Sequence, residues 1–217
     1  HRIGFDPDRV DHVPIQKTPA PAYTPLQYTH GLDPLAYVDG SHPEGEYTSG
    51  AGLYIPELSL RGRRHVRRIL AITPAAPHDV GRSEMIAVLK AVKEVPELTE
   101  HDCWTILSDS EVTLNILQKF IRQPHKQHEH IYLPILQEIE RTCRSRPEQF
   151  RFRKVNSHTT IIGNELADTA AKIAAGLLKE QDFRHILPLT LEEDPGIQHI
   201  PRGATIASLR FDPQAEI

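Results

Sequence analysis

The stretch LAYVDGS, residues 35–41, carries an acid, a glycine and a serine directly after a run of apolar and aromatic residues. This pattern predicts a short strand that leads into Asp39. An Asp-Gly pair is also a common turn signal after a strand, so the stretch alone has a purely structural interpretation. A functional interpretation depends on whether other acids in the chain converge on Asp39.

The length of 217 residues suits one domain of ordinary size with extensions. Residues 1–35 hold six of the 18 prolines and have no apolar periodicity, and the same character returns after about residue 182. We therefore expect a Pro-rich N-terminal extension at 1–35, a globular domain at 36–181 and a C-terminal extension at 182–217.

Composition limits the partners and the compartment. The net charge of −4 argues against simple adhesion to polyanions, but residues 36–181 are neutral overall. If four acids there bind metal, the remaining surface is positive, which is compatible with moderate nucleic-acid affinity. No run of 18 apolar residues predicts a membrane span. Cys103 and Cys143 lack metal-ligand spacing and fit reduced thiols, so we expect an intracellular protein, in the cytoplasm or nucleus, that is not secreted.

Apolar periodicity divides residues 36–181 into strands and helices. Three consecutive strands are followed by alternating helices and strands, which predicts an α/β fold with a mixed sheet and helices on its faces. The expected strands are 35–41, 50–57, 63–74, 103–110 and 149–155, and the expected helices are 83–95, 111–123, 131–143 and 164–178.

Three further acids lie where such a sheet would bring them near Asp39. Asp109 also follows an apolar strand, Glu84 lies in the first turn of a helix, and Asp168 lies in the first turns of the last helix. Each has a structural alternative. Glu84 would complement the helix dipole, Asp109-Ser110 would cap the next helix, and Asp168 would be a solvated helix acid.

The four acids together indicate metal chemistry. Clustered carboxylates repel one another unless a hard cation neutralises them. Two Mg²⁺ ions about 3.5–4 Å apart would activate a water and stabilise the leaving oxygen of a phosphodiester. We therefore predict a site for two Mg²⁺ ions, with Mn²⁺ as an expected substitute.

Four sequence blocks resemble the signature blocks of type I ribonuclease H: YVDGS, RSEMIAVLKAV, ILSDSEVTLNIL and VNSHTTIIGNELADTAAK, over about residues 36–178. The last block is most similar to ribonuclease H domains attached to reverse transcriptases of non-LTR retrotransposons. The resemblance implies a ribonuclease H-like fold, whose mixed five-stranded sheet has three antiparallel strands followed by parallel ones.

The resemblance also implies roles for individual residues. Asp39, Glu84, Asp109 and Asp168 would bind the metal ions, with Asp39 bridging both. Glu84 and Asp109 would complete the site on the nucleophile side, and Asp168 would hold the leaving-group side. His158 would lie on a loop over the site and assist proton movement or product release.

The implied substrate is an RNA–DNA hybrid, whose RNA strand would be cut internally to leave 3′-OH and 5′-phosphate ends. The 2′-OH distinguishes RNA from DNA at such a site. A covalently linked or associated reverse transcriptase is the implied partner, and no membrane is expected. The residues implied to contact nucleic acid are Gly40, Ser41, Ser110 and Asn164.

Some features depart from the family or remain open. Residues 122–132 are too short for the basic helix and loop of some members, so tethering to a polymerase would have to replace autonomous affinity. His125, His128 and His130 form an alternative metal cluster that lacks a fourth ligand. Five arginines between 61 and 68 fit either a solvated hairpin or a contact with DNA or a partner domain.

The alternative function is a non-catalytic scaffold or interaction domain of the same fold. Degenerate members normally lose acids, whereas all four are present in this chain. Another two-metal nuclease is a third possibility, but proofreading exonucleases have a D-x-E motif where this chain has Ser41.

Overall fold

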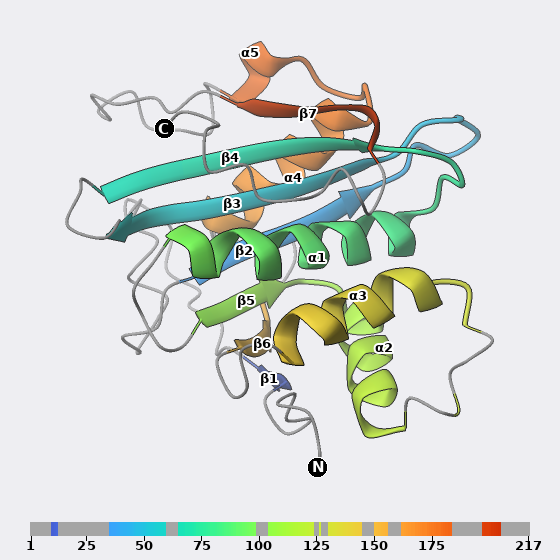
Figure 1. Cartoon of the computed structure of the whole chain (residues 1–217). Coiled ribbons are helices and arrows are strands. Elements are labelled where there is room, and N and C mark those ends of the chain that lie inside the picture. The colour runs from blue at the N-terminus through green and yellow to red at the C-terminus, as the bar shows by residue number, and fades with distance from the viewer. Residues whose placement is uncertain are drawn as a thin grey trace.

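The computed structural model describes residues 10–12, 35–59, 65–98, 104–123, 126, 130–144, 150–155, 162–183 and 197–204. Within these ranges the chain forms one mixed sheet with helices on both faces (Figure 1). The sheet has seven strands in the order β1-β6-β5-β2-β3-β4-β7. The strands are β1 (Val10–His12), β2 (Leu35–Ser41), β3 (Gly50–Ser59), β4 (His65–Pro74), β5 (Trp104–Ser108), β6 (Phe150–Lys154) and β7 (Gln198–Ala204).

Five helices accompany the sheet in the described part of the chain. None of them is long and apolar enough to cross a membrane. Their bounds are α1 (Val80–Leu98), α2 (Glu111–Arg122), α3 (Leu133–Arg144), α4 (Ile162–Ala174) and α5 (Glu180–Phe183).

The topology confirms the predicted fold class. Strands β2, β3 and β4 form an antiparallel meander, and β5 and β6 run parallel to β2. The prediction of five strands is wrong, because segments of both predicted extensions add one strand each. Strand β1 pairs with β6 and β7 pairs with β4, both in parallel.

The pairing of β2 with β5 brings two strand ends together. Val38 lies opposite Ser108 in this parallel pair, so the residues that follow them, Asp39 and Asp109, lie side by side where the pairing of β2 with β5 ends. Carboxyl ends of parallel strands meet at one edge of a sheet, where ligands of α/β proteins commonly bind. The expected convergence of these two acids is therefore a direct result of the sheet topology.

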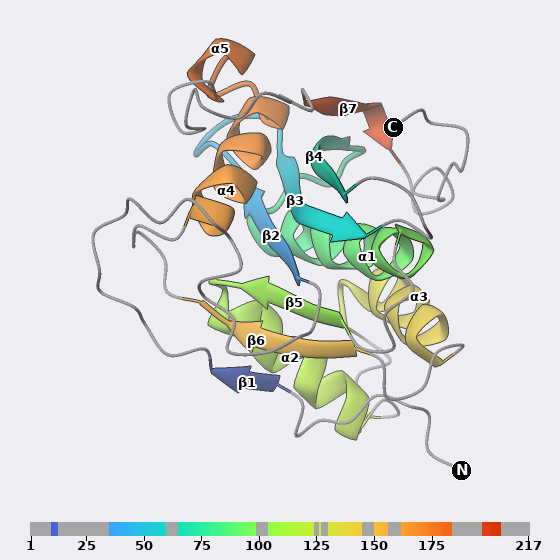
Figure 2. The same ribbon diagram turned by 90° about the vertical axis from the view of Figure 1, so that its left-hand side faces the viewer.

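Two apolar layers hold the sheet between its helices. The larger layer joins the sheet to α1, α2 and α3, and the smaller one joins it to α4. Figure 2 shows α4 on one face of β2 and β3, and α1 and α3 on the other. Burial of this kind supplies most of the stability of such a fold, at roughly 25 cal/mol per Å² of apolar surface.

Helix α4 packs on β3 at two glycines. A Cβ atom on Gly52 would lie 1.9 Å from the Ala167 carbonyl oxygen, and one on Gly50 would lie 2.0 Å from the Ala171 carbonyl oxygen. No larger residue permits this approach of a helix backbone to a strand. Because Gly52 pairs with Asp39, the contact also sets the distance between α4 and Asp39.

The first helix is longer than the sequence predicted. It begins at Val80, three residues before the expected start, because the Asp79 carboxylate accepts a hydrogen bond from the Arg82 backbone N–H at 3.0 Å and caps the first turn. The helix also continues through Pro96 and ends at Leu98. Glu84 is therefore one turn inside α1, close to its capped end.

The last long helix is shorter at its C-terminus than predicted. It ends at Ala174 instead of 178, because Gly176 adopts a φ of 81° and its N–H bonds to the Ile173 carbonyl at 3.0 Å. A glycine in this left-handed conformation is a common helix terminator.

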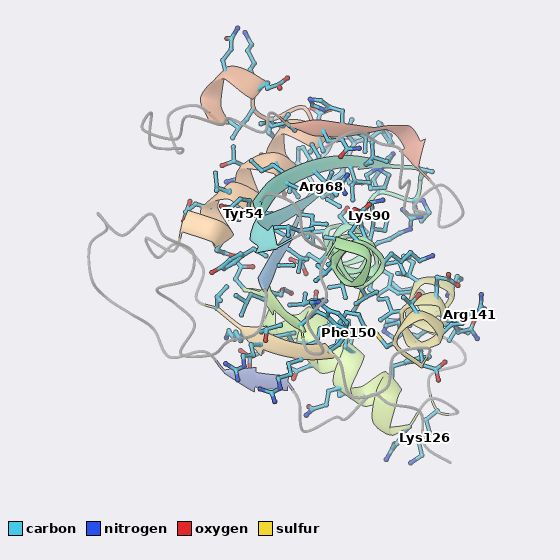
Figure 3. All side chains as sticks on the ribbon, turned by 60° about the vertical axis from the view of Figure 1, so that its left-hand side comes forward. Tyr54, Arg68, Lys90, Lys126, Arg141 and Phe150 are labelled. Carbon is cyan, nitrogen blue, oxygen red and sulfur yellow. The ribbon has the colours of Figure 1, made fainter. Side chains whose placement is uncertain are left out.

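A buried ionic network joins α1 to β4 and β7. Arg68 donates to Glu94 at 2.5 Å, and Lys90 also pairs with Glu94, at 2.6 Å. Figure 3 shows Arg68 on β4 and Lys90 on α1 within the packed interior. Arg68 makes a second bond of 2.7 Å to the Gln198 side-chain oxygen on β7. Strand β7 thus supplies a partner to a buried cation, which is costly to leave unpaired.

Replacement of Gly52 by alanine should lower the free energy of unfolding by at least about 3 kcal/mol, because the added methyl group overpacks the contact with α4. The measurement is urea denaturation followed by circular dichroism. Gly45→Ala is the control. Gly45 also has a positive φ, 77°, but a Cβ there would meet no atom within 4 Å. That variant should lose only about 1 kcal/mol, and equal losses for the two variants would contradict the packing explanation.

A chain that ends after residue 196 should be less stable than one that ends after residue 204. The shorter chain lacks β7, whose Gln198 pairs with Arg68, and it lacks Ile197 and Ile200, which pack against the two apolar layers. We expect a difference of about 2–4 kcal/mol in the free energy of unfolding. Coincident urea transitions of the two chains would show that β7 does not contribute to the fold.

Candidate metal centre

Three carboxylates from three different elements meet at the carboxyl end of the central strands. Asp39 lies in β2, Glu84 lies in α1, and Asp109 is the residue that follows β5. One oxygen atom of each lies within 4.8 Å of the other two, a spacing that can hold a metal ion. The structure therefore brings together three of the four predicted ligands.

Asp39 is at the centre of this cluster and is only 7% exposed. Burial first, and then the neighbouring charges of Asp109, Asp168 and Glu84, raise the pKa of Asp39 to about 9, although the hydrogen bond from the Gly40 N–H lowers it. That N–H donates to the carboxylate at 2.8 Å. The ionised form of Asp39 is thus disfavoured without a positive charge nearby.

Glu84 is held by the first turn of α2. The Thr113 hydroxyl donates to one Glu84 oxygen, and the Ser110 hydroxyl is a second partner. Burial nevertheless raises the pKa of Glu84, and the charges of Asp109 and Asp79 add to this increase, whereas the two hydrogen bonds oppose it without cancelling it. The cap of α2 therefore orients a side chain on a different helix.

Asp109 is oriented by Asn164, which is only 2% exposed. The Asn164 amide donates to Asp109 Oδ2 at 3.1 Å. The Asn164 Oδ1 atom has no hydrogen-bond partner among the described residues, although it is buried. An unpaired buried oxygen next to carboxylates is suited to a cation or to a donor from a ligand.

Asp168 lies on α4 and pairs with Lys172 at 2.7 Å, one turn along the same helix. This hydrogen bond, together with the charges of Asp168 and Asp39, raises the pKa of Lys172 in spite of its partial burial. Asp168 is also close enough to Asp39 to raise its pKa. The fourth predicted ligand is therefore near Asp39 but outside the group of three, and its carboxylate is paired with an ammonium group.

The other predicted site residues have mixed outcomes. His158 lies outside the described residues. Gly40 and Ser41 lie at the end of β2 beside Asp39. The side chains of Ser110 and Asn164 face the carboxylates, as supports of Glu84 and Asp109. Contacts of these four residues with nucleic acid stay a prediction.

Sequence reasoning missed Thr113 and Lys172. Thr113 lies three residues after the cap Ser110, and Lys172 lies four residues after Asp168. The i,i+4 spacing of Asp168 and Lys172 was a readable signal for an ion pair on a helix. The contact of Thr113 with Glu84 joins residues 29 positions apart and had no such signal.

The structure describes only part of the histidine cluster and of the arginine cluster that the sequence left open. His125 and His128 lie outside the described residues, whereas His130 Nδ1 accepts the backbone N–H of Tyr132 at 3.1 Å. Arg61, Arg63 and Arg64 also lie outside them, and Arg68 is buried against Glu94. Arg68 is therefore a core residue in this fold.

The donor set fits a hard divalent cation. All the converging ligands are carboxylate oxygens, of which those of Asp39 are buried and those of Glu84 and Asp109 half-buried. Mg²⁺ and Mn²⁺ prefer such oxygen ligands. A bound cation would reduce the repulsion among these acids and would favour the ionised form of Asp39, whose pKa is raised without it.

Stability in metal-free buffer should fall as pH rises from about 4 to about 9, relative to an Asp39→Asn variant. The folded chain keeps the Asp39 proton up to about pH 9, whereas the unfolded chain loses it near 3.8. Between these values the folded state binds more protons, so increasing pH favours unfolding. Asn cannot titrate and removes this contribution.

The measurement is urea denaturation of both proteins in EDTA at pH 5, 7 and 9. The free energy of unfolding of the variant, relative to that of the wild type, should increase at each step to higher pH. Saturating Mg²⁺ at pH 8 should stabilise the wild type and have little effect on the variant. A pH-independent difference would show that Asp39 is ionised in the folded protein without metal.

Comparisons with known proteins agree with this geometry. The model of the RNase H family matches residues 33–176, which is more than half of the chain. The solved structure of LC9-RNase H1, a type 1 RNase H with the type 2 active-site motif, is 20% identical, covers 68% of this chain and 75% of that one, and has a TM-score of 0.51.

The protease–reverse transcriptase of prototype foamy virus is 16% identical, with a TM-score of 0.52, over 76% of this chain and 23% of that one. Identities this low show a shared fold. No curated protein matches the chain. The family match, the sheet order and the converging acids lead to one conclusion: this chain belongs to the RNase H family.

Proposed function

We propose that the protein is an endonuclease that hydrolyses the RNA strand of RNA–DNA hybrids with two Mg²⁺ ions. One observation carries this proposal: the carboxylates of buried Asp39 and half-buried Glu84 and Asp109 converge within 4.8 Å at the strand ends of an RNase H sheet. Mn²⁺ would substitute for Mg²⁺, since it accepts the same ligands.

The four acids would divide the binding of the ions. Asp39 would contact both ions, Glu84 and Asp109 would complete one site, and Asp168 the other. Bound Mg²⁺ supplies an activated water and stabilises charge at the leaving oxygen. Asp168 would exchange its pair with Lys172, at 2.7 Å, for the second ion.

The surrounding residues would orient these acids and the substrate. Thr113 and Ser110 hold Glu84 through hydrogen bonds, and the resemblance to the family implies that Glu84 would meet the ribose 2′-OH. Asn164 holds Asp109 through its amide Nδ2, and its buried Oδ1 has no hydrogen-bond partner among the described residues. Mutation of such a supporting residue commonly lowers metal affinity or the reaction rate by about tenfold or more.

Burial of the acids argues against a purely structural role as a scaffold. A protein that only presents a surface gains nothing from carboxylates that repel one another in a shielded position. The raised pKa of Asp39 and of Glu84 is a direct sign of this cost. Perturbed acids that share a site are typical of functional centres.

We further propose that this domain acts as part of a retroelement reverse transcriptase of the non-LTR type. The block SHT…GNELAD…AK supports this origin. The short segment between α2 and α3 supports it too, because few basic residues there would contact the hybrid. Tethering to a polymerase would replace this affinity by effective concentration.

The test is incubation with four labelled duplexes in Mg²⁺: RNA–DNA, RNA–RNA, DNA–DNA and DNA that carries one ribonucleotide. The RNA strand of the hybrid should be cut internally, and a polymerase should extend the products because they end in 3′-OH. Asp39→Asn should lower the rate by more than about 100-fold, beyond the range of residues that only support ligands.

Glu111→Gln is the matched control, because Glu111 is an exposed acid in the first turn of α2 that pairs with Lys154. This variant should cut the hybrid at nearly the wild-type rate. Wild-type protein that binds Mg²⁺ but cuts none of the four duplexes would favour the scaffold role. Cleavage of the hybrid at the wild-type rate by folded Asp39→Asn would show that Asp39 has only a structural role.

A further inference from the structure

Tyr132 links the beginning of α3 to the beginning of α1. Its carbonyl accepts the backbone N–H groups of Ile135 and Leu136 at 3.0 Å, so it starts the first turn of α3. Its ring lies in the larger apolar layer and is 9% exposed. Its hydroxyl donates to the Asp79 carboxylate, 53 residues earlier in the chain.

Asp79 is the cap of α1. The same carboxylate oxygen that accepts from Tyr132 also accepts the Arg82 N–H at 3.0 Å. The Asp79 carbonyl accepts both the backbone N–H and the hydroxyl of Ser83, each at 3.0 Å. One residue therefore holds the first turn of the helix that carries Glu84.

The hydroxyl of Tyr132 reaches Asp79 because residue 81 is glycine. A Cβ atom on Gly81 would lie 2.6 Å from the Tyr132 hydroxyl. At the same turn, a Cβ atom on Gly40 would lie 2.6 Å from the Glu84 nitrogen. The first turn of α1 thus packs closely against β2 at Gly40 and against the Tyr132 hydroxyl at Gly81.

Asp79 is also electrostatically coupled to the centre, since its charge contributes to raising the pKa of Glu84. Burial and the bond to Asp79 raise the pKa of Tyr132 above its ordinary value, so the phenol stays a donor at any working pH. The donor keeps the Asp79 carboxylate on the α3 side of the turn.

We propose that Tyr132, Gly81 and Asp79 form a clamp that positions Glu84 for cation binding at the carboxylate cluster. Tyr132 is a positioning residue in this clamp and contacts no ligand itself. Loss of its hydroxyl would free the first turn of α1 and loosen the distance from Glu84 to Asp39. The proposal rests on the proposed function only where cleavage is measured, because cation binding is a separate readout.

The first experiment compares Tyr132→Phe with the wild-type chain. Phenylalanine keeps the ring in the apolar layer and removes only the hydroxyl. Mn²⁺ binding, measured by electron paramagnetic resonance, should weaken about tenfold, and the Mg²⁺ concentration for half-maximal cleavage should rise to match. KM for the hybrid should stay unchanged, and the melting temperature should fall by no more than about 4 °C.

Tyr47→Phe is the matched control. Tyr47 is 91% exposed in the loop after β2, so the same change there should leave Mn²⁺ binding unchanged. Gly81→Ala is a second route to the same defect, because its methyl group displaces the Tyr132 hydroxyl while both partners remain. This variant should also weaken Mn²⁺ binding, and it tests the clamp if Tyr132→Phe does not fold.

A double-mutant cycle separates positioning from general destabilisation. Tyr132→Phe should have little further effect in an Asp79→Ala background, because the bond is already lost. Asp79→Asn keeps a capping oxygen and should lose less Mn²⁺ affinity than Asp79→Ala.

The outcomes separate the two proposals. Wild-type Mn²⁺ affinity in folded Tyr132→Phe, or full additivity in the cycle, would overturn the clamp. Wild-type protein that binds Mn²⁺ without cutting the hybrid would overturn the proposed function. The Mn²⁺ affinities of the variants would then decide on the clamp. Absence of Mn²⁺ binding by the wild type would overturn both.

Discussion

Repulsion between the buried Asp39 carboxylate and the half-buried acids around it is the constraint on which the rest of the centre depends. Asp39 lies among three other acids with little access to water, and its pKa is raised accordingly. Each acid has its own donor: the next backbone N–H of β2 for Asp39 and an ammonium group of α4 for Asp168. Glu84 and Asp109 take theirs from a different element, a hydroxyl group of α2 and an amide of α4. The layers around the sheet matter for function because they deliver these donors to one edge.

The strand ends are the part of this centre that the sequence predicts best. Asp39 and Asp109 each follow an apolar run, and adjacent parallel strands necessarily bring such ends together. Glu84 and Asp168 lie on helices whose apolar faces are readable from their periodicity. The helix and strand pattern therefore places all four acids near one edge, although it does not give the direction of any side chain.

Contacts between distant segments are the part that the sequence does not reveal. The bond between Tyr132 and Asp79 and the inward turn of Asn164 depend on how whole elements pack. Strands β1 and β7 were missed because one is three residues long and the other contains Pro201 without clear alternation. Their pairing comes from the neighbouring strand and not from their own propensity.

Strand β7 has a consequence for how copies of the chain meet one another. Without it, β4 would present a row of unpaired backbone groups, which is a template for another chain. Strand β7 covers that row and contains Pro201, which has no N–H to offer at its own position. At the other end of the described sheet, β1 spans only three residues. The outermost strands are thus poor templates, and the two added segments protect the protein against edge-to-edge aggregation.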